Sequence, residues 1–185
     1  MDSRLPKNTE RYSLSLRTLH WIRAALIFAL ILMGLAMVRM PEDLSAKFDL
    51  YPMHKEFGIL VFLIAAVQIT IRARQRRPDP PAGLAPWERV LSKAAHHLLY
   101  VLVLLVPLMG YAMSSTFTES DGVPFFFTEL PELLPKNDAW FAAFQWLHRT
   151  LAYTLLALVA LHVVGALKHR FLDKNPANDV LRRMT

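Results

Sequence analysis

The stretch from Trp146 to His169, WLHRTLAYTLLALVALHVVGALKH, decides how this chain folds. It is apolar over most of its length and long enough to cross a hydrocarbon core as a helix, which takes about 20 residues. Two histidines, His148 and His162, lie fourteen residues apart within it. In a helix this spacing is close to four full turns, so both imidazoles share one face and lie about 21 Å apart along the axis. Ionisable residues inside a membrane segment are costly, and two on one face indicate a functional site.

The spacing of these histidines and the lack of cysteine limit the kinds of cofactor that the chain can bind. Neutral imidazole is a standard axial ligand of haem iron. The chain contains no cysteine, which excludes a haem attached through C-x-x-C-H, a thiolate-bound iron–sulfur cluster and a disulfide. The axial distance of about 21 Å is about two thirds of the thickness of a hydrocarbon core. We therefore expect one helix to carry two haems of the b type, one near each membrane face.

The composition is that of an integral membrane protein. Hydrophobic residues make up 54% of the 185 residues and gather in four long blocks. This pattern predicts an all-α protein, a single membrane domain over residues 1–185 that forms a four-helix up-down-up-down bundle with two haems between the helices. The net charge of +6 would also suit a nucleic-acid-binding protein. Because the basic residues flank the apolar blocks, we expect contact with a lipid bilayer and no nucleic acid.

Hydropathy and turn residues place the helices and their connections. The predicted helices span about residues 19–38, 53–71, 94–114 and 144–169. A polar loop at 39–52 joins the first two helices, and a basic, proline-rich connector after the second ends in a short amphipathic piece at 87–95. The loop at 114–143 is acidic and aromatic, and we expect its last part, 138–145, to form a short helix at the membrane interface. Pro107 is expected to kink the third helix.

The distribution of Lys and Arg predicts the orientation, because positive residues gather in cytoplasmic segments. The N-terminal segment contains four, the connector after the second helix six and the C-terminal tail five, whereas the other two loops share three. Both termini are therefore expected in the cytoplasm, with the protein in the bacterial inner membrane. The residues counted are, in that order, Arg4, Lys7, Arg11 and Arg17; Arg72, Arg74, Arg76, Arg77, Arg89 and Lys93; Lys168, Arg170, Lys174, Arg182 and Arg183; and Arg39, Lys47 and Lys136.

This topology sorts four histidines by depth. His20 begins the first helix and His162 lies near the end of the fourth, so both lie toward the cytoplasm. His54 begins the second helix and His148 the fourth, so both lie toward the periplasm. The simplest arrangement of axial ligands is therefore His20 with His162 at a cytoplasmic-side haem iron. His54 and His148 then bind a periplasmic-side haem iron.

Residues near these histidines fit the same cofactor. Gly58 and Ala152 each lie one turn after a ligand, where a small side chain lets a flat porphyrin approach the helix backbone. Lys55 and Arg149 directly follow the periplasmic-side ligands. They can pair with haem propionates or attract a small anionic substrate, and the sequence leaves both roles open. The arginines expected near propionates on the cytoplasmic side are Arg17, Arg23, Arg72 and Arg74.

The remaining three histidines have several possible roles. His96 begins the third helix at the cytoplasmic level, where it can contact a propionate or a quinone, compete as an axial ligand, or simply lie at the interface. His97 points about 100° away from His96 and is expected to be inert. His169 lies seven residues beyond His162, about 10 Å closer to the cytoplasm. It can hydrogen-bond a quinone carbonyl or supply a proton, because imidazole titrates near neutral pH, or it can belong to the basic flank.

These residues resemble those of the bacterial di-haem cytochrome b561 family, which is related to the cytochrome b subunits that anchor hydrogenases and formate dehydrogenases. The resemblance covers nearly the whole chain. In the family the first and fourth helices bind one haem and the second and fourth bind the other, so it implies the same pairing. It also implies a quinone site at the position of His169. The matching features are Arg17-x-x-His20-Trp21, His54-x-x-x-Gly58, His96 with Tyr100 and Pro107-Leu108-Met109-Gly110, His148 with His162, and the tail from His169 to Met184.

Three functions remain open from the sequence. The resemblance favours a stand-alone oxidoreductase, because the best understood stand-alone members oxidise superoxide at the periplasmic face and pass the electron through both haems to ubiquinone. The second is a haem-containing anchor subunit that accepts electrons from a dehydrogenase partner, with the acidic loop at 114–143 as a docking surface. The third is a metal or proton transporter. It fits less well, because its histidines would follow one continuous path instead of gathering at two depths.

Overall fold

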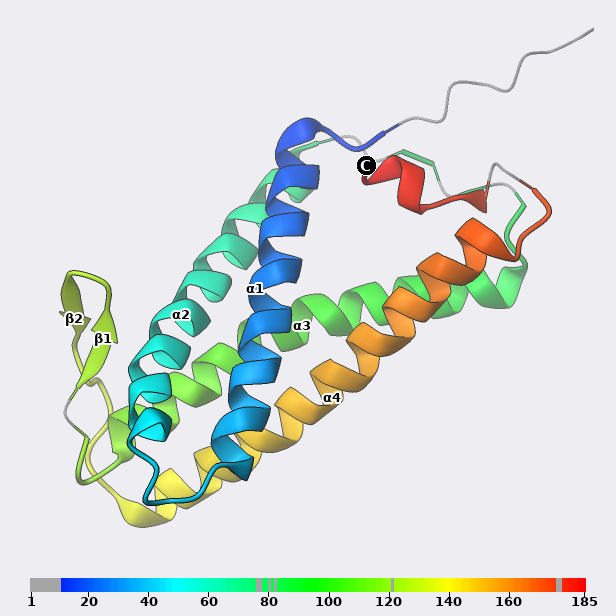
Figure 1. Ribbon diagram of the computed structural model, residues 1–185. Helices are drawn as coiled ribbons and strands as arrows, with labels where there is room; N and C mark the ends of the chain where they lie inside the picture. The colour runs from blue at the N-terminus through cyan, green and yellow to red at the C-terminus, as the bar shows by residue number, and fades with distance from the viewer. Residues whose placement is uncertain (1–10, 76–77, 80, 82, 121, 176–177) are drawn as a thin grey trace, which may run out of the picture.

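The computed structural model describes residues 11–75, 78–79, 81, 83–120, 122–175 and 178–185. Each of its four long helices is long and apolar enough to cross a membrane. The elements are α1 (Leu14–Arg39), α2 (Ser45–Arg74), α3 (Pro86–Thr116), the strands β1 (Val123–Phe125) and β2 (Thr128–Leu130), α4 (Asp138–Phe171) and the short 3-10 helix η2 (Leu181–Arg183) (Figure 1). Four of the basic residues counted above, Arg4, Lys7, Arg76 and Arg77, lie outside the described residues.

The four helices alternate in direction, which confirms the predicted up-down-up-down bundle (Figure 1). α3 packs along α4, α1 packs along α2, and α2 contacts α3. Within the described part of the chain no comparable backbone packing joins α1 to α4, so their side of the bundle is the more open one. We call the end with the start of α1 and the end of α4 the terminal end, and the end with β1 and β2 the hairpin end.

All four helices begin earlier than the hydropathy pattern predicts. The amphipathic piece at 87–95 is not separate but forms the first turns of α3, and the expected interfacial helix at 138–145 is the start of α4. Capping explains both extensions. The Glu88 carboxylate accepts a hydrogen bond from the Ala85 N–H at 2.9 Å, and Pro86 is preset for the first helical position. The Asn137 side chain accepts from the Trp140 N–H at 2.9 Å.

The loop expected at 39–52 is also shorter than predicted, because α2 begins at Ser45 and contains Pro52. Lys47 closes the turn between α1 and α2. Its ammonium donates to the Glu42 carboxylate at 2.6 Å and to the Met40 carbonyl oxygen at 3.4 Å, and the residue is only 3% exposed. This contact holds the start of α2 against the end of α1. The connection between the two helices is therefore short.

The acidic loop contains a two-stranded antiparallel hairpin that the sequence did not predict. Val123 pairs with Leu130, and the turn places Phe126 at a φ of 54°. Val123 is buried, and the Phe126 ring packs edge-on against Phe57 of α2 at 5.9 Å between centroids. Phe127, at the turn, is fully exposed. The hairpin therefore packs against α2 near Phe57 and presents the Phe127 side chain outward.

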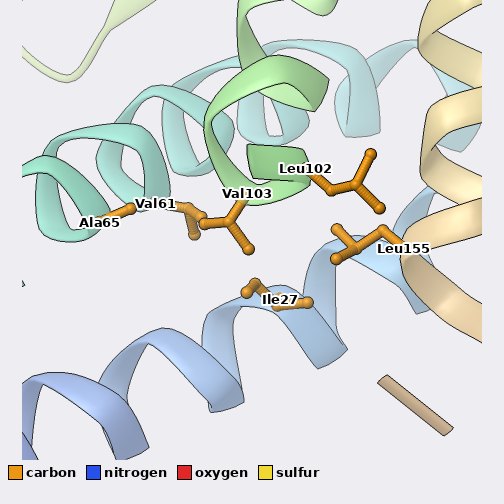
Figure 2. Packing of buried hydrophobic residues seen from close by; sticks show 6 residues of the cluster. All are labelled: Ile27, Val61, Ala65, Leu102, Val103 and Leu155. Carbon is orange, nitrogen blue, oxygen red and sulfur yellow. The ribbon is translucent and has the colours of Figure 1, made fainter. Parts of the chain in front are cut away.

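A single apolar cluster from all four helices fills the middle of the bundle (Figure 2). On α4 its member is Leu155, which lies seven residues from both His148 and His162. Ile27 of α1 and Val61 of α2 each lie seven residues after the first histidine of their helix. The cluster therefore lies midway between the two histidine levels. Its remaining members are Ala65 of α2 and Leu102 and Val103 of α3.

The C-terminal tail folds back over the terminal end of the bundle (Figure 1). The Trp21 indole N–H donates to the Met184 carbonyl oxygen at 2.7 Å, and the Tyr12 N–H donates to the carbonyl oxygen of Arg183 at 3.1 Å. The guanidinium of Arg183 also donates to the Asp79 carbonyl oxygen at 2.5 Å. The tail thus joins the start of α1 to the connection between α2 and α3.

Truncating Leu155 tests the central cluster. Leu155→Ala should lower the free energy of unfolding by about 2 to 3 kcal/mol, because it leaves a cavity where side chains of four helices meet. The measurement is thermal unfolding in mild detergent followed by circular dichroism. Leu161→Ala is the matched control, since Leu161 is 47% exposed on the same helix and leaves no cavity. Equal losses of stability for the two variants would contradict a central packing role.

Candidate functional site

The hairpin end brings together the two histidines predicted to form a pair there. The rings of His54, on α2, and His148, on α4, lie 6.1 Å apart between centroids with their planes 85° apart. His148 Nδ1 lies 2.9 Å from the Val106 carbonyl oxygen. Because a carbonyl only accepts, Nδ1 must carry the hydrogen, and the Nε2 lone pair is left for a metal. Within the described part of the chain, His54 Nδ1 is buried without a hydrogen-bond partner.

A glycine on α3 makes room for the His148 ring. A Cβ at Gly110 would lie 3.1 Å from both Cε1 and Nδ1 of His148, which is closer than ordinary van der Waals contact. Only a residue without a side chain therefore lets the imidazole approach α3 without displacement. On α1, a Cβ at Gly34 would lie 3.5 Å from His54 Cε1, an ordinary contact. Gly110 thus positions the ring whose Nδ1 faces Val106.

The terminal end brings together three histidines from three helices. The centroids of His20 and His162 lie 6.4 Å apart, with the ring planes 63° apart. His96 lies closer to His162, at 5.1 Å and 86°. The Nδ1 of His96 lies 2.6 Å from the Ser92 carbonyl oxygen, so its Nε2 is also free. His97 turns back to the Lys93 carbonyl oxygen and takes no part in the cluster.

These distances test whether the pairs fit haem iron. Bonds of about 2 Å from a metal to two imidazole nitrogens, and about 1.1 Å from each nitrogen to its ring centre, put opposed rings about 6.2 Å apart. The pairs His54 with His148 and His20 with His162 match this value. His96 is too close to His162 to face it across one iron. Two imidazoles per site also suit the two axial positions of haem, whereas a bare ion takes four or more ligands.

Space for a flat group lies beside the hairpin-end pair. A Cβ at Gly58 would meet no heavy atom within 4 Å. An open groove of about 680 Å³ runs between the end of α1 and α4, lined by Val38, Arg149, Thr150, Tyr153, Thr154 and Ala157. Arg149 is exposed in this groove. Lys55 is half-buried instead, and its ammonium donates to the Gly122 carbonyl oxygen at 3.1 Å, so it also holds the hairpin loop against α2.

The arginines predicted near the terminal-end histidines differ in burial and in their contacts. Arg17 and Arg23 each have a buried guanidinium nitrogen that finds no hydrogen-bond partner among the described residues. Arg23 and Arg72 both lie over the ring of Tyr100. Arg74 is exposed at the end of α2 and makes none of these contacts. Burial of unpaired guanidinium groups is costly and suits an anionic group such as a propionate.

His169 lies in a network of charged side chains at the end of α4. Its Nδ1 lies 2.8 Å from the Asp173 carboxylate. Lys168 donates to the same carboxylate at 2.8 Å and to Glu88 of α3 at 2.6 Å, and Asn178 donates to Asp173 at 3.1 Å. The hydrogen bonds from Lys168 and His169 hold the pKa of Asp173 well below its usual range. Asp173 is therefore an ionised partner that orients the His169 ring.

The histidine levels, their spacing and the four spanning helices agree with one family of membrane proteins. Residues 11–185 match the model of the family described as prokaryotic cytochrome b561. This chain belongs to that family. It is 29% identical to cytochrome b561 homolog 2 of Escherichia coli strain K12 over 178 residues, which cover 95% of this chain and 91% of the relative. It is 28% identical to cytochrome b561 homolog 1 of the same organism over 180 residues, or 94% and 97% of the two chains.

Membership of the cytochrome b561 family establishes a multi-pass membrane protein that transfers electrons through haem b. Haem supplies a one-electron couple, and the residues of this chain hold it and tune its potential. Reasoning from the sequence missed the Val106 carbonyl as the partner of His148. The run Pro107-Leu108-Met109-Gly110 was noticed for its resemblance, and its glycine now has a physical reason in the approach of the His148 ring.

Substituting Gly110 tests the support of His148. Gly110→Ala should displace the His148 ring, lengthen its hydrogen bond to Val106, and weaken binding of the hairpin-end haem about tenfold. Haem titration of the apoprotein and the reduced-minus-oxidised spectrum measure the effect. Gly165→Ala on α4 is the control, because a Cβ there meets no heavy atom within 4 Å. Unchanged haem binding in Gly110→Ala would show that α3 does not position the ligand.

Proposed function

We propose that this cytochrome b561 carries two haems and moves electrons across the membrane, from a small periplasmic donor, with superoxide as the leading candidate, to ubiquinone. The two opposed imidazole pairs carry the proposal, since both have the centroid spacing of axial ligands and both use the same face of α4. In it, His54 and His148 bind the hairpin-end iron. His20 and His162 bind the terminal-end iron.

The length of α4 makes the electron path short. His148 and His162 lie about 21 Å apart along the helix, and the edges of two porphyrins come closer together than their irons. The apolar cluster around Leu155 lies between the two levels. It excludes water from the path and holds the helices in register, so that the distance between the two levels stays constant.

Charge supports the orientation with both termini in the cytoplasm and the protein in the bacterial inner membrane. The terminal end carries the basic residues of the C-terminal tail, and the end of α2 and the start of α3 add Arg72, Arg74, Arg89 and Lys93. The hairpin end carries mainly acidic loop residues. Under the positive-inside rule the terminal end faces the cytoplasm.

The network around His169 supports a quinone site at the cytoplasmic level. Its Nδ1 is held by ionised Asp173, which leaves Nε2 to hydrogen-bond a quinone carbonyl. The stoichiometry requires two donors for each quinone. Two superoxide anions lose one electron each and leave as dioxygen, while ubiquinone takes up these two electrons and two protons from the cytoplasm to become ubiquinol. His169 transfers one of the protons, and Asp173 orients its ring.

On the periplasmic side, Arg149 and Lys55 are the candidates for attracting an anionic donor. Arg149 is exposed in the open groove, where its positive charge raises the local concentration of a small anion. The same position also suits a propionate contact. Lys55 follows His54 directly, and its ammonium donates a hydrogen bond to the Gly122 carbonyl oxygen. Its positive charge is therefore held at one place near the surface, where it attracts the anionic electron donor.

One observation favours the second candidate, an anchor subunit for a dehydrogenase. Phe127 is fully exposed at the turn of a hairpin that is fixed to α2, and acidic residues surround it in the loop. An exposed aromatic residue on a rigid support is typical of a protein contact. A dehydrogenase that purifies with the native protein in mild detergent and is lost in Phe127→Ser would favour the anchor subunit over the stand-alone enzyme.

The haem count tests the proposal directly. The purified protein should contain two b-type haems, and His148→Ala and His162→Ala should each lose a different one, as measured by pyridine haemochrome assay and redox titration. His97→Ala is the control, because its ring faces the Lys93 carbonyl oxygen outside both pairs. One haem in the wild type, or loss of the same haem in both variants, would refute the two-haem arrangement.

Removing the His169 imidazole tests the quinone site. His169→Ala should slow ubiquinone reduction by about 100-fold or more while both haems remain, because it removes a proton donor and not a ligand. Asp173→Asn should slow it less. Stopped-flow oxidation of the reduced haems by a short-chain ubiquinone gives the rate, and Lys174→Ala is the control for loss of a nearby exposed charge. Unchanged rates in His169→Ala would place the quinone elsewhere.

A further inference from the structure

A tyrosine between two arginines lies beside the terminal-end histidines. The guanidinium carbon of Arg23, on α1, lies 5.5 Å from the centroid of the Tyr100 ring, on α3. The guanidinium carbon of Arg72, on α2, lies 5.3 Å from the same centroid. Guanidinium groups stack favourably on aromatic faces. Three helices therefore bring two positive charges around one ring inside a membrane bundle.

Neither charge is neutralised by the part of the chain that the structure describes. Arg23 is only 9% exposed, and its Nη1 is buried without a hydrogen-bond partner. Among the described residues no carboxylate lies within ion-pair distance of Arg23 or Arg72. Contact with one aromatic ring does not offset the cost of burying the Arg23 guanidinium, and Arg72, which is half-exposed, adds a second positive charge beside it. Two guanidinium groups in this arrangement call for an anion.

The arginines lie next to the terminal-end ligands. Arg23 follows His20 by three residues on α1, and Arg72 lines the same cavity as His96. A cavity of about 250 Å³ lies between α2 and α3 beside Arg72 and His96. It is lined by Ile69, Arg72, Ala73, His96, His97 and Tyr100. An anion there can reach Arg72 and the free Nε2 of His96.

We propose that Arg23 and Arg72, held around Tyr100, bind a carboxylate of the haem at the terminal end. This inference rests on the proposed function, because it requires a haem between His20 and His162. A lipid phosphate has the same chemistry, but Arg23 is shielded from lipid, which favours an anion from inside the bundle. Haem brings two propionates, and the planar guanidinium matches a carboxylate with two parallel hydrogen bonds.

The arginine pair also sets the direction of electron flow. Positive charge near a haem stabilises the reduced form, which has one negative charge more than the oxidised form. The hairpin-end pair has no corresponding buried arginine among the described residues. The terminal-end haem therefore has the higher potential, and electrons pass from the hairpin end toward the terminal end.

A redox titration of the two-haem protein tests this assignment. Arg23→Gln and Arg72→Gln should each lower the equilibrium constant for reduction of one haem about tenfold, or about 59 mV for a one-electron couple. The other haem should not shift. Arg23→Lys should recover most of the loss, because it keeps the charge. Arg74→Gln, which removes an exposed arginine from the same end of α2, is the matched control and should shift neither haem.

Each outcome decides between the alternatives. If Arg23→Gln fails to retain haem, Arg72→Gln, which changes a half-exposed side chain, gives the same test. Shifts no larger than those of Arg74→Gln would overturn the proposal. Unchanged potentials with loss of co-purified anionic lipid, measured by native mass spectrometry, would overturn it in favour of a lipid phosphate. The haem content of the wild type is measured first, so failure of the two-haem proposal is recognised separately.

Discussion

The cost of placing polar groups in hydrocarbon is the constraint on which this structure depends. His148 and His162 lie on one face of α4, and neither can face lipid without penalty. Both therefore turn toward other helices, and each finds one ring at the spacing of opposed axial ligands. Helix packing follows from this, with α3 along α4 as support and α1 and α2 as the sources of the opposing imidazoles.

Between the two histidine levels, apolar side-chain packing holds the four helices together. The central cluster draws apolar side chains from all four helices (Figure 2). Its member on α4, Leu155, lies seven residues from both His148 and His162. Toward each end of the bundle, individual contacts of polar side chains add to the apolar packing. At the hairpin end, Gly110 has no Cβ to block the His148 ring, so His148 reaches the Val106 carbonyl oxygen. At the terminal end, Tyr100 holds two guanidinium groups near the histidine cluster.

The helices and the histidine pairs were predictable from the sequence, but the ends of the helices were not. A hydropathy window detects only the part of a helix that suits hydrocarbon. The first turns of α3 and α4 lie beyond that part and form because Glu88 and Asn137 cap them. The hairpin was missed because its strands have three residues each and depend on packing of Val123 and Phe126 against α2. Such contacts have no periodic signature in the sequence.

The sequence by itself determined the spans, the fourteen-residue spacing on α4 and the depth of each histidine, because these follow from apolar length and helical period. The tertiary structure decided the distances between the rings. His20 and His96 have the same depth, but their ring centroids lie 6.4 Å and 5.1 Å from that of His162. It also decided which arginines are buried and unpaired, since the exposure of Arg23 and Arg74 depends on which neighbouring helix covers each residue. The depth of a histidine in the membrane depends on its own helix alone, whereas the distance between two rings and the burial of a side chain depend on how several helices pack.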